Sequence, residues 1–217
     1  MSIEIGDKSI HALDTCKNRI CAFLDVGFGT VQKICMNESI QVLGYHGTSR
    51  ANAIRILREG FRVSSNDYDW LGEGVYFFQD APLRASQWAK EQYSEDPVVI
   101  RSSIRLENSI DLFDIQWFAT LKAAYQSFKT KYERNNLPLP SQNPTRSKAH
   151  RLDCEFFDYI TQLLLSQDEK VETIRAVFVE GESIFPNSAI FDLAHVQIAV
   201  RNTALIQESQ LIEVGDI

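Results

Sequence analysis

The order of the secondary-structure signals along the chain is its most restrictive feature. Runs of apolar and β-branched residues that are typical of strands come early and late, at 39–45, 74–78, 98–105, 175–180 and 195–201. The longest helical patterns, 112–133 and 152–166, lie between the third and the fourth of these runs. Strands at both ends of a helical block do not fit a regular βαβ repeat, so the sequence predicts an α+β fold.

Shorter helices are predicted at 49–59 and 82–93. The first begins after a suitable N-cap, Ser49, and ends at Gly60. Its apolar residues recur at helical spacing and define the face that we expect to be buried. The residues of that face are Ala53, Ile54 and Leu57.

The composition is that of a globular protein. Of the 217 residues 44% are hydrophobic and 24% are charged, which is enough for one domain with its own core. The formal net charge is −7. Proteins that hold long nucleic acids by charge are usually basic, because neutralised phosphates supply most of their affinity. The charge therefore argues against a general nucleic-acid coat protein, but not against contact with a few nucleotides.

Cysteine usage and apolar runs indicate the compartment. The cysteines Cys16, Cys21, Cys35 and Cys154 form no CxxC pair, and no histidine cluster completes a zinc set. Cys16 and Cys21 could be metal ligands or redox partners, but we expect scattered buried thiols in a reducing cytosol. There is no signal-peptide pattern and no run of the roughly 20 apolar residues that a membrane span needs. We expect a cytoplasmic protein with no metal and no membrane partner.

Three short motifs are associated with predicted strands. They are Tyr-His-Gly-Thr at 45–48, Gly-Glu-Gly-Val-Tyr-Phe at 72–77 and His-Val-Gln-Ile at 195–198. Taken singly, each has an ordinary explanation: a satisfied histidine at a strand end, a tyrosine in the core and an outward-facing glutamine. Their combination and order carry the functional signal.

In this order the motifs resemble the NAD-binding site of the ADP-ribosyltransferase superfamily. The similarity is to its histidine–tyrosine branch, which includes poly(ADP-ribose) polymerase catalytic domains and diphtheria-like toxins, and it spans residues 41–206. The resemblance implies a split antiparallel β-sheet with inserted helices at about 110–170. It also implies a single ADP-ribosyltransferase-like catalytic domain over residues 1–217, with NAD as its co-substrate.

The resemblance assigns His46, Tyr76 and Trp88 to the NAD cleft. His46 offers two ring nitrogens for hydrogen bonds to the ribose and the carboxamide. Gly47 lets its backbone approach the flat carboxamide, where a Cβ would obstruct it. Tyr76 and Trp88 would stack on the nicotinamide ring, with about 0.5–2 kcal/mol for each contact. Trp88 matches after a slight lengthening of the preceding loop, and a core anchor of its helix is its other interpretation.

Further cofactor-binding candidates flank these residues. The family often has a serine three residues before the second aromatic; this chain has Ala85 there, and Ser86 beside it is the candidate. Thr48 continues the histidine motif. Arg50 is a phosphate candidate because it lies near a helix N-terminus. Arg201 could also meet a phosphate, although a surface salt bridge is its more ordinary role.

The third motif departs from the family at its main position. The family usually has a glutamate on this late strand, and this chain has Gln197. A carboxylate can hold the ribose 2′-hydroxyl and favour a developing cation, whereas an amide can only hydrogen-bond. The departure argues against processive chain elongation. Glu180 or Glu182 could supply a carboxylate if the preceding loop folds inwards, and solvated loop charges are the alternative.

We therefore expect a mono-ADP-ribosyltransferase with His46, Tyr76 and Gln197 as its catalytic residues. A stand-alone unit of this size resembles the bacterial toxin and antiphage effector members of the superfamily, which implies an antitoxin protein as a partner. The macromolecular acceptor would be a protein side chain or a nucleic-acid base. An NAD glycohydrolase and a catalytically silent NAD- or ADP-ribose-binding module are the alternatives.

Overall fold

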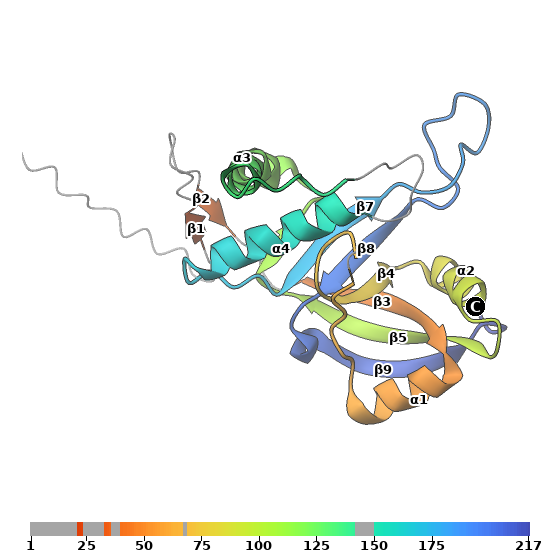
Figure 1. The fold of residues 1–217 in the computed structure, drawn as a ribbon. Coiled ribbons are helices and arrows are strands. Elements are labelled where there is room, and N and C mark those ends of the chain that lie inside the picture. Colours follow the sequence, from red (N-terminus) through yellow and green to blue (C-terminus); the bar gives the residue numbers. More distant parts are fainter. Residues whose placement is uncertain (1–20, 24–32, 36–39, 67–68, 142–149) are drawn as a thin grey trace, which may run out of the picture.

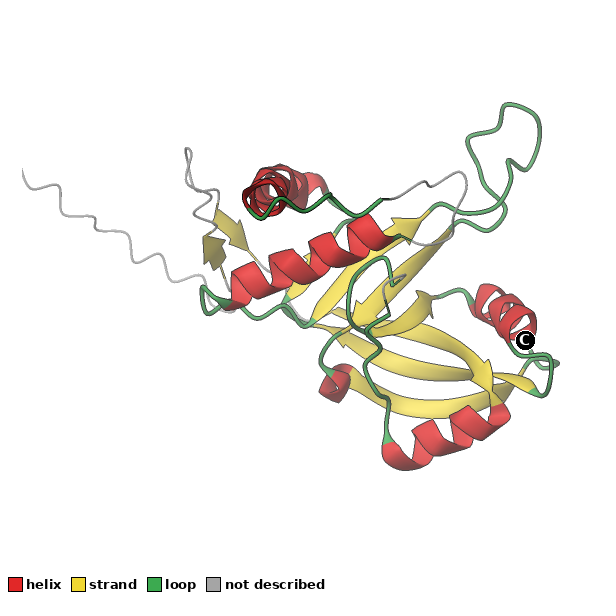
Figure 2. Ribbon diagram, in the orientation of Figure 1, coloured by secondary structure: helices red, strands yellow, loops and turns green. Residues whose placement is uncertain are grey.

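The centre of the molecule is a seven-stranded sheet (Figures 1 and 2). The computed structural model describes residues 21–23, 33–35, 40–66, 69–141 and 150–217. Across the sheet the strands are β6 (Ser109–Asp111), β7 (Thr173–Phe178), β8 (His195–Val200), β4 (Val75–Gln79), β3 (Ile40–Ser49), β5 (Pro97–Leu106) and β9 (Ile206–Glu213). The β6–β7 pair is parallel and the other pairs are antiparallel. Two short strands, β1 (Cys21–Phe23) and β2 (Lys33–Cys35), form a separate antiparallel pair.

Helices cover both faces of this sheet. They are α1 (Arg50–Glu59), α2 (Pro82–Gln92), α3 (Phe118–Arg134) and α4 (Arg151–Leu165), with short 3-10 turns η1 (Ile115–Trp117) and η2 (Thr203–Leu205). Helix α1 packs through Ala53 against Val98 and Ile100 of β5. Helix α2 lies on the opposite face, where Ala85 packs with Val99 of the same strand. Because successive strand side chains point to opposite faces, the two helices enclose this half of the sheet.

The sheet is divided between β3 and β4. Strand β3 pairs with β5 along ten residues, from Ile40 to Ser49. It pairs with β4 through only two, Gly44 with Gln79 and Tyr45 with Phe78. The sheet thus has a four-stranded half, β6-β7-β8-β4, and a three-stranded half, β3-β5-β9. Only the two β3–β4 residue pairs join them. The fold is mixed α and β with a mostly antiparallel sheet, as the α+β prediction requires.

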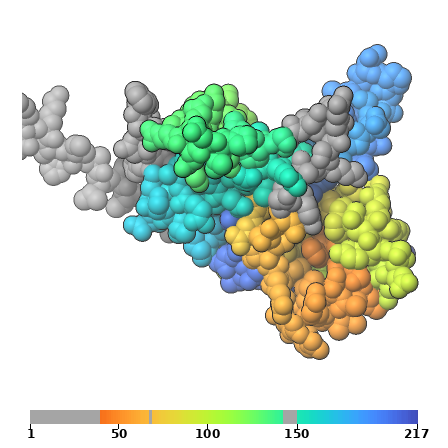
Figure 3. Space-filling model, viewed as in Figure 1, coloured from red at the N-terminus to blue at the C-terminus, as the bar shows by residue number. Residues whose placement is uncertain are grey.

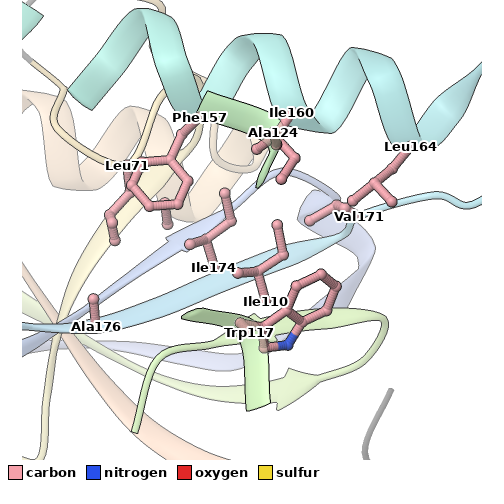
Figure 4. Close-up of a cluster of buried hydrophobic side chains, with 11 residues drawn as sticks. Leu71, Ile110, Trp117, Ala124, Phe157, Ile160, Leu164, Val171, Ile174 and Ala176 are labelled. Carbon is pink, nitrogen blue, oxygen red and sulfur yellow. The ribbon is translucent and has the colours of Figure 1, made fainter. Parts of the chain in front are cut away.

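The main hydrophobic core lies between α4 and the four-stranded half (Figure 4). Phe157, Ile160 and Leu164 of α4 point down onto Ile174 and the neighbouring strand residues. The other fully buried members of the cluster are Leu71, Ile110, Trp117, Ala124 and Ala199. Burying Leu, Ile or Phe side chains contributes about 1.5–3 kcal/mol each, so this layer fixes the position of β7 and β8.

Several element boundaries differ from the sequence predictions. The strand predicted at 39–45 continues to Ser49, so that His46 lies within a strand instead of at its end. The long helix predicted from residue 112 begins at Phe118, after the η1 turn that buries Trp117. Strands β6 and β9 were not predicted. Both are weak signals: β6 has three residues, and β9 is an edge strand with a mixed polar sequence, Ile-Gln-Glu-Ser-Gln-Leu-Ile-Glu.

Helix α1 has the predicted ends but a different buried face. Ser49 caps it by accepting a hydrogen bond from the Asn52 N–H, and Gly60 follows at φ +87°. Ala53 is buried, as predicted, but Ile54 is 56% exposed and Leu57 is 43% exposed. The partly buried Ile56 takes their place beside the core. The prediction was wrong for Ile54 and Leu57 because the helix packs on β5 through Ala53 and Ile56, which leaves the other two side chains facing outwards.

Candidate functional site

Separation of the two sheet halves leaves the backbone of Gly47, a buried residue, at a strand edge that is unpaired on the β4 side. In an antiparallel ladder, alternate residues direct their N–H and C=O groups to the same neighbouring strand. The Leu43 carbonyl faces β4, because it accepts from the Asp80 N–H at 3.0 Å, and Tyr45 pairs with Phe78. Gly47 is the next residue in this row, and the β3–β4 ladder ends before it. Its N–H and C=O therefore point into the split with no ladder partner on β4.

The side chain of His46 bridges the same split. Its Nδ1 lies 2.9 Å from the carbonyl oxygen of Tyr76, on the edge of β4 that would face β3 if pairing continued. A carbonyl can only accept, so Nδ1 carries the proton. The imidazole also packs against Phe61 and Phe77, with ring centroids 5.4 and 5.7 Å away. His46 thus replaces the ladder bond that is lost where the strands diverge.

The protonation of His46 follows from its surroundings. Burial lowers the pKa of His46 from its ordinary value, and the hydrogen bond to the Tyr76 carbonyl acts weakly in the opposite direction. The ring is therefore neutral at pH 7, with its single proton on Nδ1. Nε2 is then a hydrogen-bond acceptor, which suits a hydroxyl donor.

The phenol of Tyr76 is anchored at its tip. Its hydroxyl donates to the Gly72 carbonyl at 2.7 Å and accepts from the Leu71 N–H at 2.9 Å. Burial, with a smaller contribution from the charge of Asp69, raises the pKa of Tyr76 well above its ordinary value. The hydroxyl stays protonated and holds the turn that leads into β4. The ring, and not an ionised oxygen, is what Tyr76 can offer to a ligand.

Trp88 lies on α2, which packs over the edge of β3 that borders the split. We call this edge, at Gly47, the β3 lip. A Cβ built on Gly47 would come 2.5 Å from the Ala85 carbonyl oxygen and 3.2 Å from Cε3 of the Trp88 ring. Glycine is thus required at position 47 by the packing of α2 on β3, whatever ligand binds. Tyr76 and Trp88 stand on opposite halves of the sheet, and no ring contact joins them among the described residues.

The amide of Gln197, on β8, is hydrogen-bonded at both ends. Oε1 accepts from Nε1 of Trp70 at 2.5 Å, and Nε2 lies 3.0 Å from Nε2 of His195. Nδ1 of His195 lies 2.6 Å from the carbonyl oxygen of Leu193. An indole N–H can only donate and a carbonyl can only accept, so the donors run in one direction from Trp70 through Gln197 and His195 to Leu193.

Aromatic rings enclose this chain of hydrogen bonds. Phe78 of β4 lies 4.7 Å from the His195 ring, and Phe178 of β7 lies 5.5 Å from it on the other side. Phe178 also packs against Trp70 at 4.8 Å and against His150, just before α4, at 5.2 Å. The polar groups of Gln197 and His195 are therefore held in a largely apolar setting, where hydrogen bonds are stronger than in water.

A charged pair borders the same ring cluster. Arg84 of α2 is 9% exposed, and its Nη2 bonds to Oε2 of Glu180 at 2.7 Å. The guanidinium lies 5.4 Å from the Phe78 ring centroid. The loop after β7 thus turns one carboxylate, Glu180, inwards as the sequence allowed. The backbone of Glu182 instead bonds to Asp192 within the loop.

The two arginines considered for a phosphate point elsewhere. Arg50 forms a bidentate pair with Glu213 of β9, at 2.9 and 2.6 Å, and a third bond to Asp96 at 2.7 Å. Because β9 lies beyond β5 at the far edge, this side chain is directed away from the split. Arg201 bonds to the Glu73 carbonyl at 2.8 Å and to Asp158 of α4 at 3.1 Å. Both geometries argue against a phosphate role and for structural ion pairs.

The two other candidates, Ser86 and Thr48, are buried, and Thr48 adjoins Gly47 on β3. Ser86 lines a shallow surface pocket with Leu83, Lys90 and the C-terminal residues Val214 and Ile217. Thr48 is only 2% exposed, within β3. Neither is brought next to Tyr76 or Gln197 by a contact among the described residues.

No cluster of three or more His, Cys, Asp or Glu side chains in the described part of the chain has the arrangement of a metal site. Cys154 is buried, and Cys16 lies outside the described residues. Among the helices of the described ranges, none has the length and apolarity to span a membrane.

Sequence reasoning missed Trp70, His195 as a partner of Gln197, and Arg84. Trp70 and Gln197 are 127 residues apart, so no local pattern joins them. His195 offered one signal, because residues two apart on a strand share a face and can therefore touch. Arg84 offered no signal, because its contacts with Glu180 and with the Phe78 ring depend on how α2 lies against β4.

Comparison with known proteins adds no relative to this description. Neither the search against models of protein families nor the search of curated proteins gives a match. What the chain does must therefore be inferred from the split between β3 and β4 and from the side chains that border it.

Proposed function

We propose that this chain binds NAD in the split between β3 and β4 and transfers ADP-ribose to a macromolecular acceptor. The observation that carries the proposal is the unpaired edge at Gly47, whose N–H and C=O have no ladder partner on β4. One donor and one acceptor side by side match the two groups of a planar carboxamide such as that of nicotinamide. The proposal agrees with the motif resemblance, which reaches the same residue.

The groups around this edge suit the rest of an NAD molecule. Tyr76 of β4 and Trp88 of α2 belong to the two halves of the sheet, and their rings are the candidates for stacking on the flat, positive nicotinamide ring. Nε2 of His46 is an acceptor for a ribose hydroxyl. The apolar rings of Phe78 and Phe178 pack against His195, the partner of Gln197, where they would limit the access of water.

Cleavage of NAD requires stabilisation of the positive charge that develops on the ribose. When NAD is cleaved, the bond between nicotinamide N1 and ribose C1′ breaks, and its electron pair leaves with nicotinamide. A nucleophile of the acceptor forms the new bond to C1′ and loses its proton. The amide oxygen of Gln197 carries a partial negative charge, and hydrogen bonds hold it in place before the reaction, as electrostatic stabilisation requires. In the family that the motifs resemble, repeated elongation goes with a glutamate at this position, so Gln197 favours a single transfer.

This split-sheet architecture, with inserted helices α3 and α4, corresponds to an ADP-ribosyltransferase-like fold in the proposal. A toxin or antiphage effector role, with an antitoxin partner, is the biological setting that the resemblance favours. An NAD glycohydrolase would use the same cleft with water as the acceptor. A silent binding module would bind NAD and leave it intact.

Incubation with NAD labelled in the adenine ring separates these functions. Transfer puts label on a macromolecule, hydrolysis yields free ADP-ribose, and a binding module leaves the label in NAD. We expect macromolecular label, and digestion with protease or with nuclease then identifies the acceptor class. If calorimetry detects no NAD binding and the labelled NAD persists, the proposal is wrong.

Point variants test the cleft assignment. His46→Ala and Trp88→Ala should each weaken NAD binding by about tenfold, the equivalent of one lost hydrogen bond or ring contact. Tyr76→Phe should bind NAD nearly as well as the parent, because the ring is kept and only the anchoring hydroxyl is lost. Arg62→Ala, on an exposed side chain, is the control. Unchanged NAD affinity in both alanine variants would show that NAD does not bind between β3 and β4.

A further inference from the structure

We propose that His195 is a positioning residue, which in its neutral form orients the Gln197 amide with its nitrogen towards His195 and its oxygen towards Trp70. The inference rests on the proposed function for its catalytic consequence, but the orientation itself belongs to the free protein. It also makes the glutamine at position 197 a built feature of this site and not a weakened glutamate.

Two independent constraints fix the amide. At one end, Trp70 Nε1–H can only donate, so the atom 2.5 Å from it must be the oxygen of Gln197. At the other end, the Leu193 carbonyl requires a proton on Nδ1 of His195. A neutral ring then has a bare Nε2, so the atom of Gln197 that faces it at 3.0 Å must be the donating amide nitrogen. The two ends demand the same orientation.

The surroundings of His195 favour the neutral ring. Burial lowers the pKa of His195 from its ordinary value, and the charge of Arg84 from α2 lowers it further. The Leu193 carbonyl and the charge of Glu180 act in the opposite direction. The rings in contact, Phe78 and Phe178, carry no charge. His150, another titratable residue of the described part of the chain, packs against Phe178.

The orientation has a catalytic consequence. The Gln197 oxygen has a second lone pair beside the one that Trp70 uses, and this can accept from a ribose hydroxyl or face a developing cation. If His195 takes up a proton, its Nε2 becomes a donor and repels the amide N–H. The amide must then turn over or lose its partner, and NAD turnover should fall.

A glutamate at position 197 would meet a mismatch. Its two oxygens can both only accept, so one still suits Trp70 but the other faces the bare Nε2 of neutral His195. A protonated His195 would relieve this mismatch. Gln197→Glu should therefore raise the pKa of His195, and its NAD turnover should increase towards acid pH, the reverse of the parent protein.

Nitrogen NMR on the free, full-length chain tests the orientation without any activity. With histidine ¹⁵N-labelled and titrated from about pH 5 to 8, His195 should show the Nδ1–H tautomer and protonate below its ordinary range. In Gln197→Glu it should protonate at a higher pH than in the parent. Gln210→Glu, on the exposed side of β9, is the matched control and should leave the titration unchanged. An Nε2–H tautomer, or the same titration in Gln197→Glu and the parent, would overturn the inference.

NAD turnover then tests the consequence. His195→Phe keeps a ring of similar shape but cannot accept a hydrogen bond. We expect kcat to fall about tenfold with little change in KM, and the loss of activity on acidification to disappear. An unchanged kcat or a persistent acid limb would show that His195 does not position Gln197 for the reaction. If the parent protein consumes no NAD, the proposed function fails, whereas the NMR result still decides the orientation.

Discussion

The two halves of the sheet hold their site residues by different means. In the three-stranded half, β3-β5-β9, the Gly47 edge is placed by close packing of α2, with no room for a Cβ. In the four-stranded half, β6-β7-β8-β4, Gln197 is placed by a directed series of hydrogen bonds from Trp70 to Leu193. Shape determines one lip of the split, and polarity determines the other.

This difference predicts different responses to change. A lip placed by packing responds most strongly to changes of volume, because protein interiors are close-packed. A lip placed by hydrogen bonds tolerates small changes of volume but depends on the protonation of its members. The loop that precedes β4 lies between the two halves: its gold atoms occupy the middle of the face in Figure 3, between the teal atoms of α4 and the orange atoms of α1.

The largest effect is expected where the two halves meet, at Phe77. Its buried ring contacts both His46 on the β3 lip and Phe61 on the loop. Phe77→Ala should lower the free energy of unfolding by about 3–5 kcal/mol, because it leaves a cavity there. Denaturant unfolding measures this loss, and Phe185→Ala on an exposed loop is the control. A loss no greater than that of the control would mean that the halves are joined elsewhere.

Gly47→Ala should be the next largest. The added Cβ would meet the Ala85 carbonyl, a backbone atom that cannot rotate away, so α2 must shift from β3. We expect a loss of about 1–3 kcal/mol of stability, as for overpacked cores, together with weaker NAD binding. Gly215→Ala, where nothing lies within 4 Å, is the matched control. Equal stability of the two variants would show that shape does not set this lip.

The sequence predicted the features that local patterns determine, and it did not predict the contacts between distant residues. Apolar runs predicted β3, β4, β5, β7 and β8, and the caps predicted the ends of α1, because these signals are local. The open edge at Gly47 could be anticipated only through the motif resemblance. The partners of Gln197 could not be anticipated, since Trp70 reaches it across 127 residues of chain. Hydrogen bonds of this kind depend on the register of β7 and β8 and on the path of a loop, neither of which is encoded in a short window.

Acid pH should destabilise both lips through their histidines. His46 and His195 have folded-state pKa values below the ordinary value, mainly because of burial. The unfolded chain therefore binds more protons between the folded-state pKa and about 6.5, so stability is complete above that pH and is lost as the pH falls through the window. Each histidine contributes at most about 1.4 kcal/mol per pH unit. Unfolding curves of the parent, His46→Phe and His195→Phe between about pH 5 and 8 should show a reduced slope in each variant; an unchanged slope in either would mean that its ring is already accessible to protons.

The smallest effect is expected at Glu213, at the far edge of the three-stranded half. The Arg50 guanidinium lowers the pKa of Glu213 by hydrogen bonding, but both side chains are part-exposed, and such pairs contribute little to stability. Glu213→Gln should leave the unfolding midpoint and the NAD affinity unchanged, since Asp96 still holds Arg50 away from the split. NAD titration of Glu213→Gln beside the parent measures this. A gain in affinity would show that Arg50, once released, reaches the NAD phosphates, and that charge as well as shape acts on the β3 lip.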